Sequence, residues 1–343
     1  MTAAFSTGFS SRIEAVAVHL PSRTETNAEL HAQVPEWNVL EAAKHTGVEV
    51  RHLSAPDETA LDLAEQACLK LFADPAVQPE TLDLLLFCTQ TPDQRLPGNA
   101  CLLHGRLKLP ARVGALDINL ACSGFVYSLI VANGLIESGA AQRVLIVTAD
   151  TYTKLISPED RSTRLLFSDG AAATLLTRSP GSSRVIGSAW GTDGSLSAAF
   201  CVPGGAARLP TPPEPLETVQ DGPNRRTRDQ IAMNGKTMLQ FTYSMVPPHL
   251  QALAAAHGLT LDDVQHFLFH QASAMVLGGL QARLKLDDAR LHRNLAATGN
   301  TVSASIPILL HDTLKAGHIR RGETLLLSGF GAGLSWASVL LVY

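Results

Sequence analysis

The sequence lacks any lysine- or arginine-rich tract. Its 27 basic residues are outnumbered by 31 acidic ones, which gives a net charge of −4 and an isoelectric point near 6.3. The longest basic cluster, Arg225 to Arg228, lies in a proline-rich stretch beside Asp221 and Asp229, and we interpret it as a solvated loop. Proteins that bind nucleic acid usually carry a basic patch. No nucleic-acid partner is therefore expected.

Long apolar runs are also absent. No stretch reaches the roughly 18 apolar residues that a membrane span needs. The opening segment, MTAAFSTGFSSR, shows neither the basic nor the apolar region of a signal peptide. These two absences predict a protein without a membrane partner and located in the cytoplasm.

Cysteine is scarce, and its spacing fits no framework. The five cysteines are an odd number and include no CxxC pair, so neither a disulfide framework nor a structural zinc site is expected. The thiols should be reduced, which leaves one of them free to act as a nucleophile. Cys68 and Cys88 lie within patterns typical of a buried core, where packing is their expected role.

The chain is long enough, at 343 residues with 45% hydrophobic side chains, to hold about two domains' worth of structure. Short apolar runs alternate with helical patterns along it. These runs are continuous rather than alternating, which is typical of strands buried on both faces. The predicted strands are 13–19, 83–89, 143–149, 184–190, 264–269 and 323–328, and the predicted helices are 59–73, 97–107, 123–137, 235–256, 273–284 and 302–316.

The order of these elements repeats at an offset of about 180 residues, which indicates two halves of one topology related by a pseudo-dyad. The halves are residues 1–180 and 181–343. Residues 203–230 are rich in proline and are interpreted as a surface excursion, either a loop without function or a cover over a substrate entrance. The matched pairs are strands 83–89 and 264–269, strands 143–149 and 323–328, and the hairpin-like segments 165–176 and 328–343.

One cysteine has a distinctive setting. In DINLACSGFVYSL (117–129), Cys122 lies between a strand-like run and a helical pattern, with small residues on either side. Small residues permit the sharp strand-to-helix turn on which nucleophiles are displayed. The N-terminus of a helix favours a thiolate and lowers the pKa of the thiol from about 8.5. Cys122 is therefore a candidate nucleophile, with the packed core cysteine as the commoner alternative.

His270 is a second candidate, because in HFLFHQASAMVL it marks the change from a predicted strand to a predicted helix. Strand ends near a topological crossing are where α/β folds place their sites. The pseudo-dyad puts His270 at the same end of the core as Cys122, and a structural role is the alternative. His266 lies four residues earlier, but without an acidic ligand nearby a metal pair is improbable, and no metal is expected.

Two further motifs are rich in small residues. Asn300 follows Gly299 in NLAATGNTVSASIPILL, a setting typical of a turn or an N-cap. The glycines of LLLSGFGAGLSW resemble a dinucleotide-binding fingerprint, but that motif needs a following helix, and here a strand-like segment follows. We interpret this motif as a tight turn that aims backbone N–H groups inward.

Together DINLACSGFVYSL, FHQAS, GNTVSASIP and GFGAGLSW, in this order and spacing, closely resemble β-ketoacyl-acyl-carrier-protein synthase III and its relatives in the thiolase superfamily. TGVEVRH (46–52) and PEDRST…FSDGAAAT (158–174) extend the resemblance over nearly the whole chain. The resemblance implies a thiolase-like α/β fold of five layers, α/β/α/β/α, with one mostly buried sheet in each half. It also implies a homodimer formed through the first half, and neither a metal nor a redox cofactor.

By this resemblance Cys122 accepts the acyl group of an acyl-CoA thioester. The backbone N–H of Cys122 and one from the Gly331–Ala332 turn are implied to form the oxyanion hole, with Ala332 standing where the family usually continues a run of glycines. His270 and Asn300 are implied to donate hydrogen bonds to the enolate that forms when a malonyl thioester loses CO2. Attack on the acyl thioester then gives a β-ketoacyl product.

The resemblance also assigns substrate-binding residues. Trp37 and Arg161 lie where relatives sandwich the adenine ring of CoA, and Arg283 keeps a basic rim for an acyl carrier protein. Leu96 falls where a partner subunit's side chain bounds the acyl pocket. A leucine there, in place of a phenylalanine, is expected to leave room for acyl groups longer than acetyl.

Three departures from the family pattern favour a specialised fatty-acid or polyketide-type pathway. Met275 replaces a basic residue that helps to bind the phosphopantetheine carrier, and Gln240 stands where a lysine is common. His45 takes the place of an arginine near the CoA phosphates. Because carrier docking is largely electrostatic, losing these cations should weaken or redirect it.

Other functions fit parts of the pattern. A related enzyme would pass the acyl group from Cys122 to an oxygen or nitrogen nucleophile without decarboxylation, and the intact Asn300 favours condensation over this alternative. A non-catalytic subunit would typically have lost the nucleophile. A papain-like cysteine hydrolase would carry a flanking signature that this sequence lacks.

Overall fold

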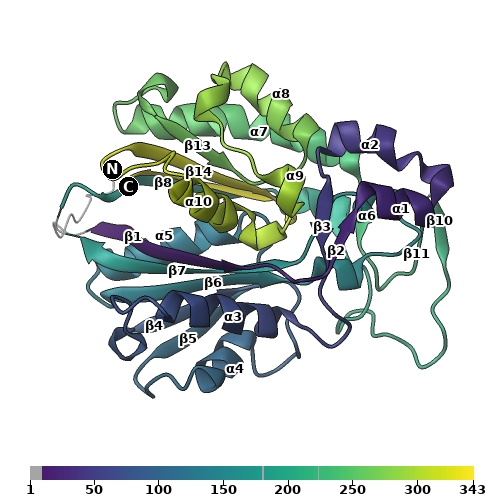
Figure 1. Cartoon of the computed structure of the whole chain (residues 1–343), viewed down its shortest axis with the longest axis horizontal. Helices are drawn as coiled ribbons and strands as arrows, with labels where there is room; N and C mark the ends of the chain where they lie inside the picture. The colour runs from purple at the N-terminus through teal and green to yellow at the C-terminus, as the bar shows by residue number, and fades with distance from the viewer. Residues whose placement is uncertain (1–9, 180, 223) are drawn as a thin grey trace.

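The structure, a computed structural model, describes residues 10–179, 181–222 and 224–343. Residues 1–9, which include most of the segment inspected for a signal peptide, lie outside the described residues. Two β-sheets are stacked, and layers of helices lie between them and on their outer faces (Figure 1). Among the helices described, none is both long and apolar enough to cross a membrane.

The first sheet contains β1 (Ser10–His19), β4 (Leu84–Cys88), β5 (Gly114–Ile118), β6 (Arg143–Asp150) and β7 (Gly170–Ser179). Its order is β1-β7-β6-β4-β5, with β6, β4 and β5 parallel and with β7 antiparallel to both β6 and β1. The apolar strands β4 and β6 are almost entirely buried, as expected for strands covered on both faces.

The second sheet contains β8 (Arg184–Thr192), β13 (His266–Phe269), β14 (Thr324–Gly331) and β15 (Ser335–Val342). The order β8-β15-β14-β13 repeats that of β1-β7-β6-β4, with two antiparallel pairings followed by a parallel one. Among the described strands β5 has no counterpart. The offset in the sequence thus corresponds to a repeated topology.

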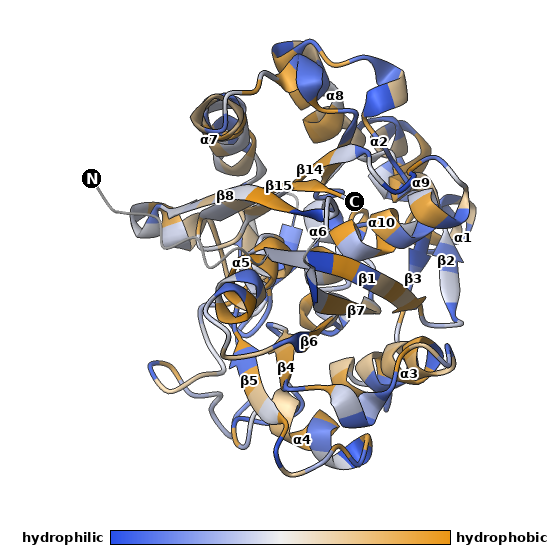
Figure 2. Ribbon diagram, turned by 90° about the vertical axis from the view of Figure 1, so that its left-hand side faces the viewer, coloured by the Kyte–Doolittle hydropathy of each residue, from blue (hydrophilic) through white to orange (hydrophobic). Residues whose placement is uncertain are grey.

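In the described part of the chain, six helices form the helical layers of the five-layered fold that the sequence predicts (Figure 1). Two of them pack between the sheets and contact both, and the other four cover the outer faces. The middle layer is α5 (Gly124–Glu137) with α10 (Ser305–Lys315), the first outer layer is α3 (Ala60–Phe72) with α4 (Asn99–Arg106), and the second is α7 (Gly235–Ala256) with α8 (Ala274–Leu284). Figure 2 shows α5 mainly in hydrophobic colours, as expected for a helix that is buried over most of its length.

Local sequence explains where three of these helices begin. Thr59 and Asp62 form a capping box at the start of α3, and Asn234 and Ser273 accept backbone N–H groups at the starts of α7 and α8. The predicted helix 302–316 is a short 3-10 turn followed by α10. The predicted long elements are therefore present, with small shifts at their ends.

The segment 165–176, predicted as hairpin-like, does not pair with itself. Strand β7 begins only at Gly170 and pairs with β6 and β1. The residues before it are bound elsewhere, since Ser168 N–H donates to Asn300 O and the Asp169 carboxylate accepts from Ser54 and Thr153. Long-range contacts, rather than a local turn, hold this segment.

Shorter elements surround the sheets. The excursion 203–230 contains a small hairpin, β10 (Val219–Asp221) with β11 (Asn224–Arg226), whose Arg225 pairs with Glu159 at 2.9 Å. The remaining elements are β2 (Thr24–Thr26), α1 (Asn27–Gln33), α2 (Val39–Thr46), β3 (Val50–His52), α6 (Arg161–Arg164), β9 (Phe200–Cys201), β12 (Ala232–Met233) and α9 (Leu295–Thr298).

Candidate active site

Cys122 lies in the turn between β5 and α5, where the sequence predicts it, and is buried. Gly124 opens the helix against the core, and a Cβ atom there would lie 2.2 Å from the sulfur of Cys88. Only glycine fits this contact without movement of Cys88. Cys68 and Cys88 are fully buried, which confirms their predicted place in the core.

The glycines of GFGAGLSW bring β14 directly against Cys122. A Cβ atom on Gly331 would lie 2.8 Å from the Cys122 sulfur, and one on Gly329 would lie 2.6 Å from the Cys122 carbonyl oxygen. The backbone N–H groups of Cys122 and Ala332 both donate toward the sulfur. In this turn the backbone N–H of Ala332 therefore points toward the nucleophile, as the sequence predicts.

The protonation of Cys122 differs from the expectation. Burial raises the pKa of the Cys122 thiol to about 12, and the nearby Asp150 carboxylate raises it as well. The N–H groups of Cys122 and Ala332 lower the pKa but do not offset burial. The expected thiolate at a helix N-terminus is therefore wrong for the protein without substrate, because loss of hydration outweighs the helix dipole.

His270 lies at the end of β13 and is buried beside Phe330. Its Nδ1 is 2.7 Å from the hydroxyl of Ser305 at the start of α10, and its backbone N–H donates to Ser328 O. Burial lowers the pKa of His270 to about 3. The imidazole is therefore neutral near pH 7, and Ser305 fixes its orientation through one ring nitrogen.

Asn300 is held between the two halves of the chain. Its backbone N–H donates to Leu166 O, and its carbonyl accepts from Ser168 N–H. Its side-chain Oδ1 accepts from Val302 N–H at 3.0 Å, while Nδ2 has only a long contact of 3.5 Å to Ala272 O. The amide oxygen is thus occupied, and the amide N–H2 remains a donor.

Cys122, His270 and Asn300 line a single cavity of about 420 Å³, together with Gly331. Its other walls are mainly apolar and include Phe167, Phe200 and Phe330 among others. The structure therefore brings together the three candidates that lie 148 and 30 residues apart in the sequence. The resulting site offers a thiol, a neutral imidazole and an amide donor in an apolar space.

A second cavity, of about 620 Å³, is lined in part by Ala332 and Gly333, which follow Gly331 of the first cavity. Tyr152 and Phe200 line it, and the Tyr152 hydroxyl donates to Gln90 Oε1 at 2.6 Å. Phe200 lines both cavities. Both ends of the excursion 203–230 contribute, through residues 204–206 and Asp229, so this segment borders a cavity next to the nucleophile.

The four predicted substrate-binding residues lie outside the described lining of the Cys122 cavity. Arg161 begins α6, but the guanidinium over the Trp37 ring is that of Arg164, 5.9 Å from the ring centroid. Arg283 covers the ring of Tyr243 at 3.7 Å. Leu96 is 82% exposed in the loop before α4.

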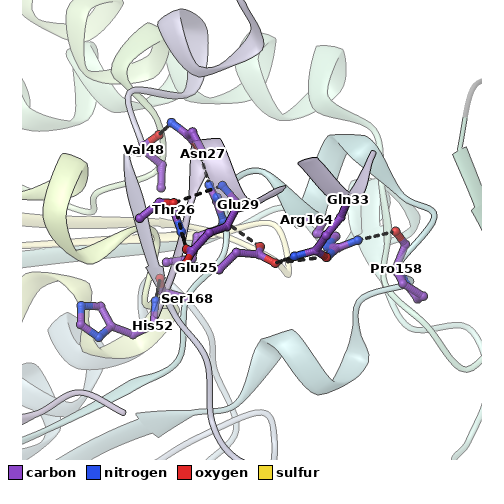
Figure 3. Close-up of polar contacts among 11 residues, drawn as sticks. Glu25, Thr26, Asn27, Glu29, Gln33, Val48, His52, Pro158, Arg164 and Ser168 are labelled. Atoms are coloured by element: carbon purple, nitrogen blue, oxygen red, sulfur yellow. Dashed lines mark hydrogen bonds and ion pairs between the residues drawn. The ribbon is translucent and has the colours of Figure 1, made fainter. Parts of the chain in front are cut away.

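A buried ion cluster supports the segment that carries Trp37 (Figure 3). Glu25 on β2 contacts two cations, with Oε2 3.4 Å from Arg51 Nε and Oε1 3.2 Å from Arg164 Nη2. Arg164 also donates to Gln33 Oε1 at 2.7 Å. The cluster ties β2 and α1 to α6, and no local motif in the sequence indicates it.

Sequence reasoning also missed two polar supports of the site. The buried Asp150 carboxylate accepts from Gln90 N–H, from Thr89 and from Ser303, which follows Asn300 by three residues. Ser305, in the run SASIP, orients His270. Small hydroxyl residues after an Asn resemble a helix start, so only the fold reveals these partners.

Comparison with known proteins gives one consistent result. The family model for 3-oxoacyl-[acyl-carrier-protein] synthase III matches residues 116–194, and the model for its C-terminal part matches residues 254–343. A β-ketoacyl-[acyl-carrier-protein] synthase III from Caldanaerobacter subterraneus subsp. tengcongensis is 32% identical over 326 residues, which cover 94% of this chain and 95% of the relative.

Solved structures agree with the sequence matches. The crystal structure of a 3-oxoacyl-(acyl-carrier-protein) synthase III superimposes with a TM-score of 0.95 and 39% identity, covering 97% of this chain and all of that one. The priming β-ketosynthase from the R1128 polyketide biosynthetic pathway superimposes with a TM-score of 0.81 and 27% identity, covering 97% and 96%. Both the predicted fold and the predicted resemblance are confirmed. The chain belongs to the β-ketoacyl-acyl-carrier-protein synthase III family of the thiolase superfamily, a family of condensing acyltransferases.

Proposed function

We propose that this chain takes an acyl group from acyl-CoA onto Cys122 and condenses it with a malonyl thioester to give a β-ketoacyl product. The observation that carries the proposal is the shared cavity, in which a buried thiol faces two uncharged hydrogen-bond donors from the other half of the chain. No metal or redox cofactor takes part in this chemistry.

In the first step the Cys122 sulfur attacks the thioester carbonyl, the bond to the CoA sulfur breaks, and CoA leaves as a thiol with the proton of Cys122. Negative charge develops on the carbonyl oxygen between these events. The N–H groups of Cys122 and Ala332, which converge beside the sulfur, are suited to stabilise it. Because the free thiol has a raised pKa, its proton leaves during the attack rather than before it.

In the second step the malonyl thioester loses CO2, and the electron pair of the broken bond forms an enolate. His270 and the amide of Asn300 donate hydrogen bonds to the enolate oxygen. The lowered pKa makes the imidazole neutral, so it carries a single N–H. In the tautomer whose Nδ1 accepts from the Ser305 hydroxyl, that proton lies on Nε2, the nitrogen that would donate to the enolate. The enolate carbon then attacks the acyl carbonyl and releases Cys122, which regains a proton.

We further propose that the enzyme is a homodimer formed through its first half. Strand β5 is the edge of the first sheet, and its Leu116 is 49% exposed. In such a dimer the exposed Leu96 of the partner subunit would bound the acyl pocket. A Leu96→Phe variant should then shift the preference toward shorter acyl-CoAs, whereas unchanged chain-length preference would contradict this placement.

The pathway is proposed to be a specialised one, of fatty-acid or polyketide type. Met275 is 47% exposed and lines the cavity at the position where relatives carry a cation, and Gln240 lies on the neighbouring face of α7. Both departures reduce the positive charge available to an acyl carrier protein. Trp37 and Arg161 remain proposed contacts for the nucleotide end of CoA, with Arg164 already placed on the Trp37 ring.

The first test is the intact mass of the protein after mixing with acyl-CoAs of increasing length, beside a Cys122→Ala control. A gain of one acyl group that the control lacks is expected, and no adduct with any acyl-CoA would overturn the acylation step. Release of CO2 from a carboxyl-labelled malonyl thioester then tests condensation. An acyl-enzyme that transfers its acyl group to an alcohol or amine without CO2 release would favour the acyltransferase alternative instead.

A further inference from the structure

The cavity that holds Cys122 has a single charged side chain in its described lining, that of Lys236. The other lining residues are apolar or are neutral polar groups, because His270 has a pKa of about 3. Lys236 lies in the first turn of α7 and is exposed. Because Lys236 is exposed, its charge stays hydrated while its side chain lines an otherwise uncharged cavity.

Within the described part of the chain, the ammonium group of Lys236 has no hydrogen-bond or ion-pair partner. Other lysines differ, since Lys154 donates to Pro56 O and Lys44 pairs with Glu41 at 2.5 Å. Lys236 therefore plays no part in fixing α7 to its neighbours. Its charge remains available to a ligand.

Lys236 marks the open end of the cavity, and the reacting groups mark the closed end. Cys122, His270 and Asn300 are all buried, whereas Lys236 and Met275 are exposed. A thioester whose carbonyl reaches Cys122 must extend past Lys236 on its way out to solvent. The group that lies beside Lys236 is then some way along the substrate from the thioester.

The residues near Lys236 at this entrance are either uncharged or have their charge engaged elsewhere. Gln240 follows it by one helical turn on the same face of α7, and Met275 faces the same cavity from α8. Arg283 is engaged elsewhere, with its guanidinium 3.7 Å from the Tyr243 ring centroid and donating to Gly279 O. Lys236, one helical turn before Gln240, thus provides a positive charge near the two uncharged positions 240 and 275.

We propose that Lys236 binds the phosphate at the end of the pantetheine arm, a group shared by CoA thioesters and by carrier-bound thioesters. The inference rests on the function proposed above. A malonyl carboxylate is a poorer match, because a cation beside it would stabilise the charge that decarboxylation removes. Lys236 is therefore a positioning residue that acts on binding of the arm, and not a catalytic residue.

The experiment compares Lys236→Gln with the wild type on three acyl donors, namely an acyl-CoA, the matching acyl-carrier thioester and the matching acyl-pantetheine, which lacks the phosphate. Removing one partly exposed charge pair should raise KM for the phosphorylated donors roughly fivefold and leave kcat unchanged. KM for acyl-pantetheine should not change. Lys236→Glu should enlarge the effect, and Lys315→Gln, a change at an exposed lysine at the end of α10, is the matched control.

Each outcome decides the inference. A loss confined to phosphorylated donors supports it, and a loss with CoA alone or with the carrier alone identifies which donor presents its phosphate to Lys236. An equal loss with acyl-pantetheine, or no loss with any donor, overturns it. Binding of CoA and of pantetheine, measured by calorimetry, needs no turnover: a weaker CoA affinity in Lys236→Gln with unchanged pantetheine affinity supports the inference even if the acyl-enzyme never forms, while unchanged CoA affinity rejects it.

Discussion

The contact between β14 and Cys122 gives a prediction that distinguishes an effect on the rate of acylation from an effect on the stability of the fold. In a Gly331→Ala variant the new Cβ would lie 2.8 Å from both the sulfur and the Cβ of Cys122. Carbon atoms in real proteins do not approach so closely, so either the strand or the thiol must move. Rotation about one torsion moves the sulfur, whereas the Cβ of Cys122 moves only with the backbone, so both the thiol and the backbone must shift.

The expected result follows from the size of that movement. The sulfur must shift by several tenths of an ångström, away from the N–H groups of Cys122 and Ala332 that converge on it. Misplacement of a reacting group by about 1 Å can cost on the order of 100-fold in rate. We therefore expect acylation to slow by roughly 10- to 100-fold while the protein stays folded.

Gly329→Ala is expected to behave differently. Its Cβ would meet backbone atoms, the Cys122 carbonyl oxygen at 2.6 Å and the Ser123 Cα at 2.8 Å. Backbone cannot rotate aside, so strain should appear as a loss of about 1–3 kcal/mol in the free energy of unfolding. Gly105→Ala in α4, where an added Cβ meets nothing within 4 Å, is the matched control and should leave acylation unchanged without any loss of stability.

The assay follows the intact mass of the acyl-enzyme over time and the melting temperature of each variant. The reasoning requires that Gly331→Ala slows acylation, and that it loses less stability than Gly329→Ala, whose added Cβ meets backbone atoms alone. If Gly331→Ala were acylated at the wild-type rate with an unchanged melting temperature, the strand would be yielding to the methyl group. The close contact would then have no bearing on catalysis.

Three further predictions concern buried polar groups. Ser305→Ala leaves Nδ1 of His270 without its partner, so CO2 release should slow while acylation stays unchanged, and a parallel loss of both would place the effect elsewhere. Burial lowers the pKa of His270 to about 3, so on acidification the unfolded chain binds this proton before the folded protein does, and the free energy of unfolding should fall as pH drops from about 6.5 toward 3. A His270→Asn variant should lose stability less steeply over this pH range. A pH dependence identical to that of the wild type would contradict a neutral buried imidazole. Glu25→Gln removes the carboxylate shared by two cations, one of them the buried Arg51, and should cost about 3–5 kcal/mol in chemical unfolding, whereas Arg225→Gln, which breaks an exposed pair, should cost less than about 1 kcal/mol.

The long elements of the fold could be predicted because their causes are local. Continuous apolar runs such as 143–149 correspond to strands buried on both faces, and Thr59 with Asp62 forms a capping box at the start of a helix. Segment 165–176 could not be predicted in this way. Its Ser168 and Asp169 take partners more than one hundred residues away, so no window of sequence contains the reason for its shape.

The candidate site was likewise predictable from the sequence only in part. Cys122 and His270 each stand at a junction of predicted elements, so the pseudo-dyad was enough to expect these two at one end of the core, whereas Asn300 was assigned to the site by the family resemblance. The protonation of Cys122 could not be predicted, because it depends on burial and on Asp150 rather than on the helix that follows. Likewise Arg164, instead of Arg161, covers Trp37, since Glu25 and Gln33 draw it there.

The middle layer of the fold has a consequence for how the enzyme fails on heating. The helices that follow Cys122 and Asn300, α5 and α10, are packed between both sheets and belong to a core cluster that contains strands of both sheets. Their amide hydrogens should exchange with solvent only when the whole molecule opens. The reacting groups are thus anchored in the slowest-exchanging part of the protein, and heat should abolish activity together with the fold rather than ahead of it.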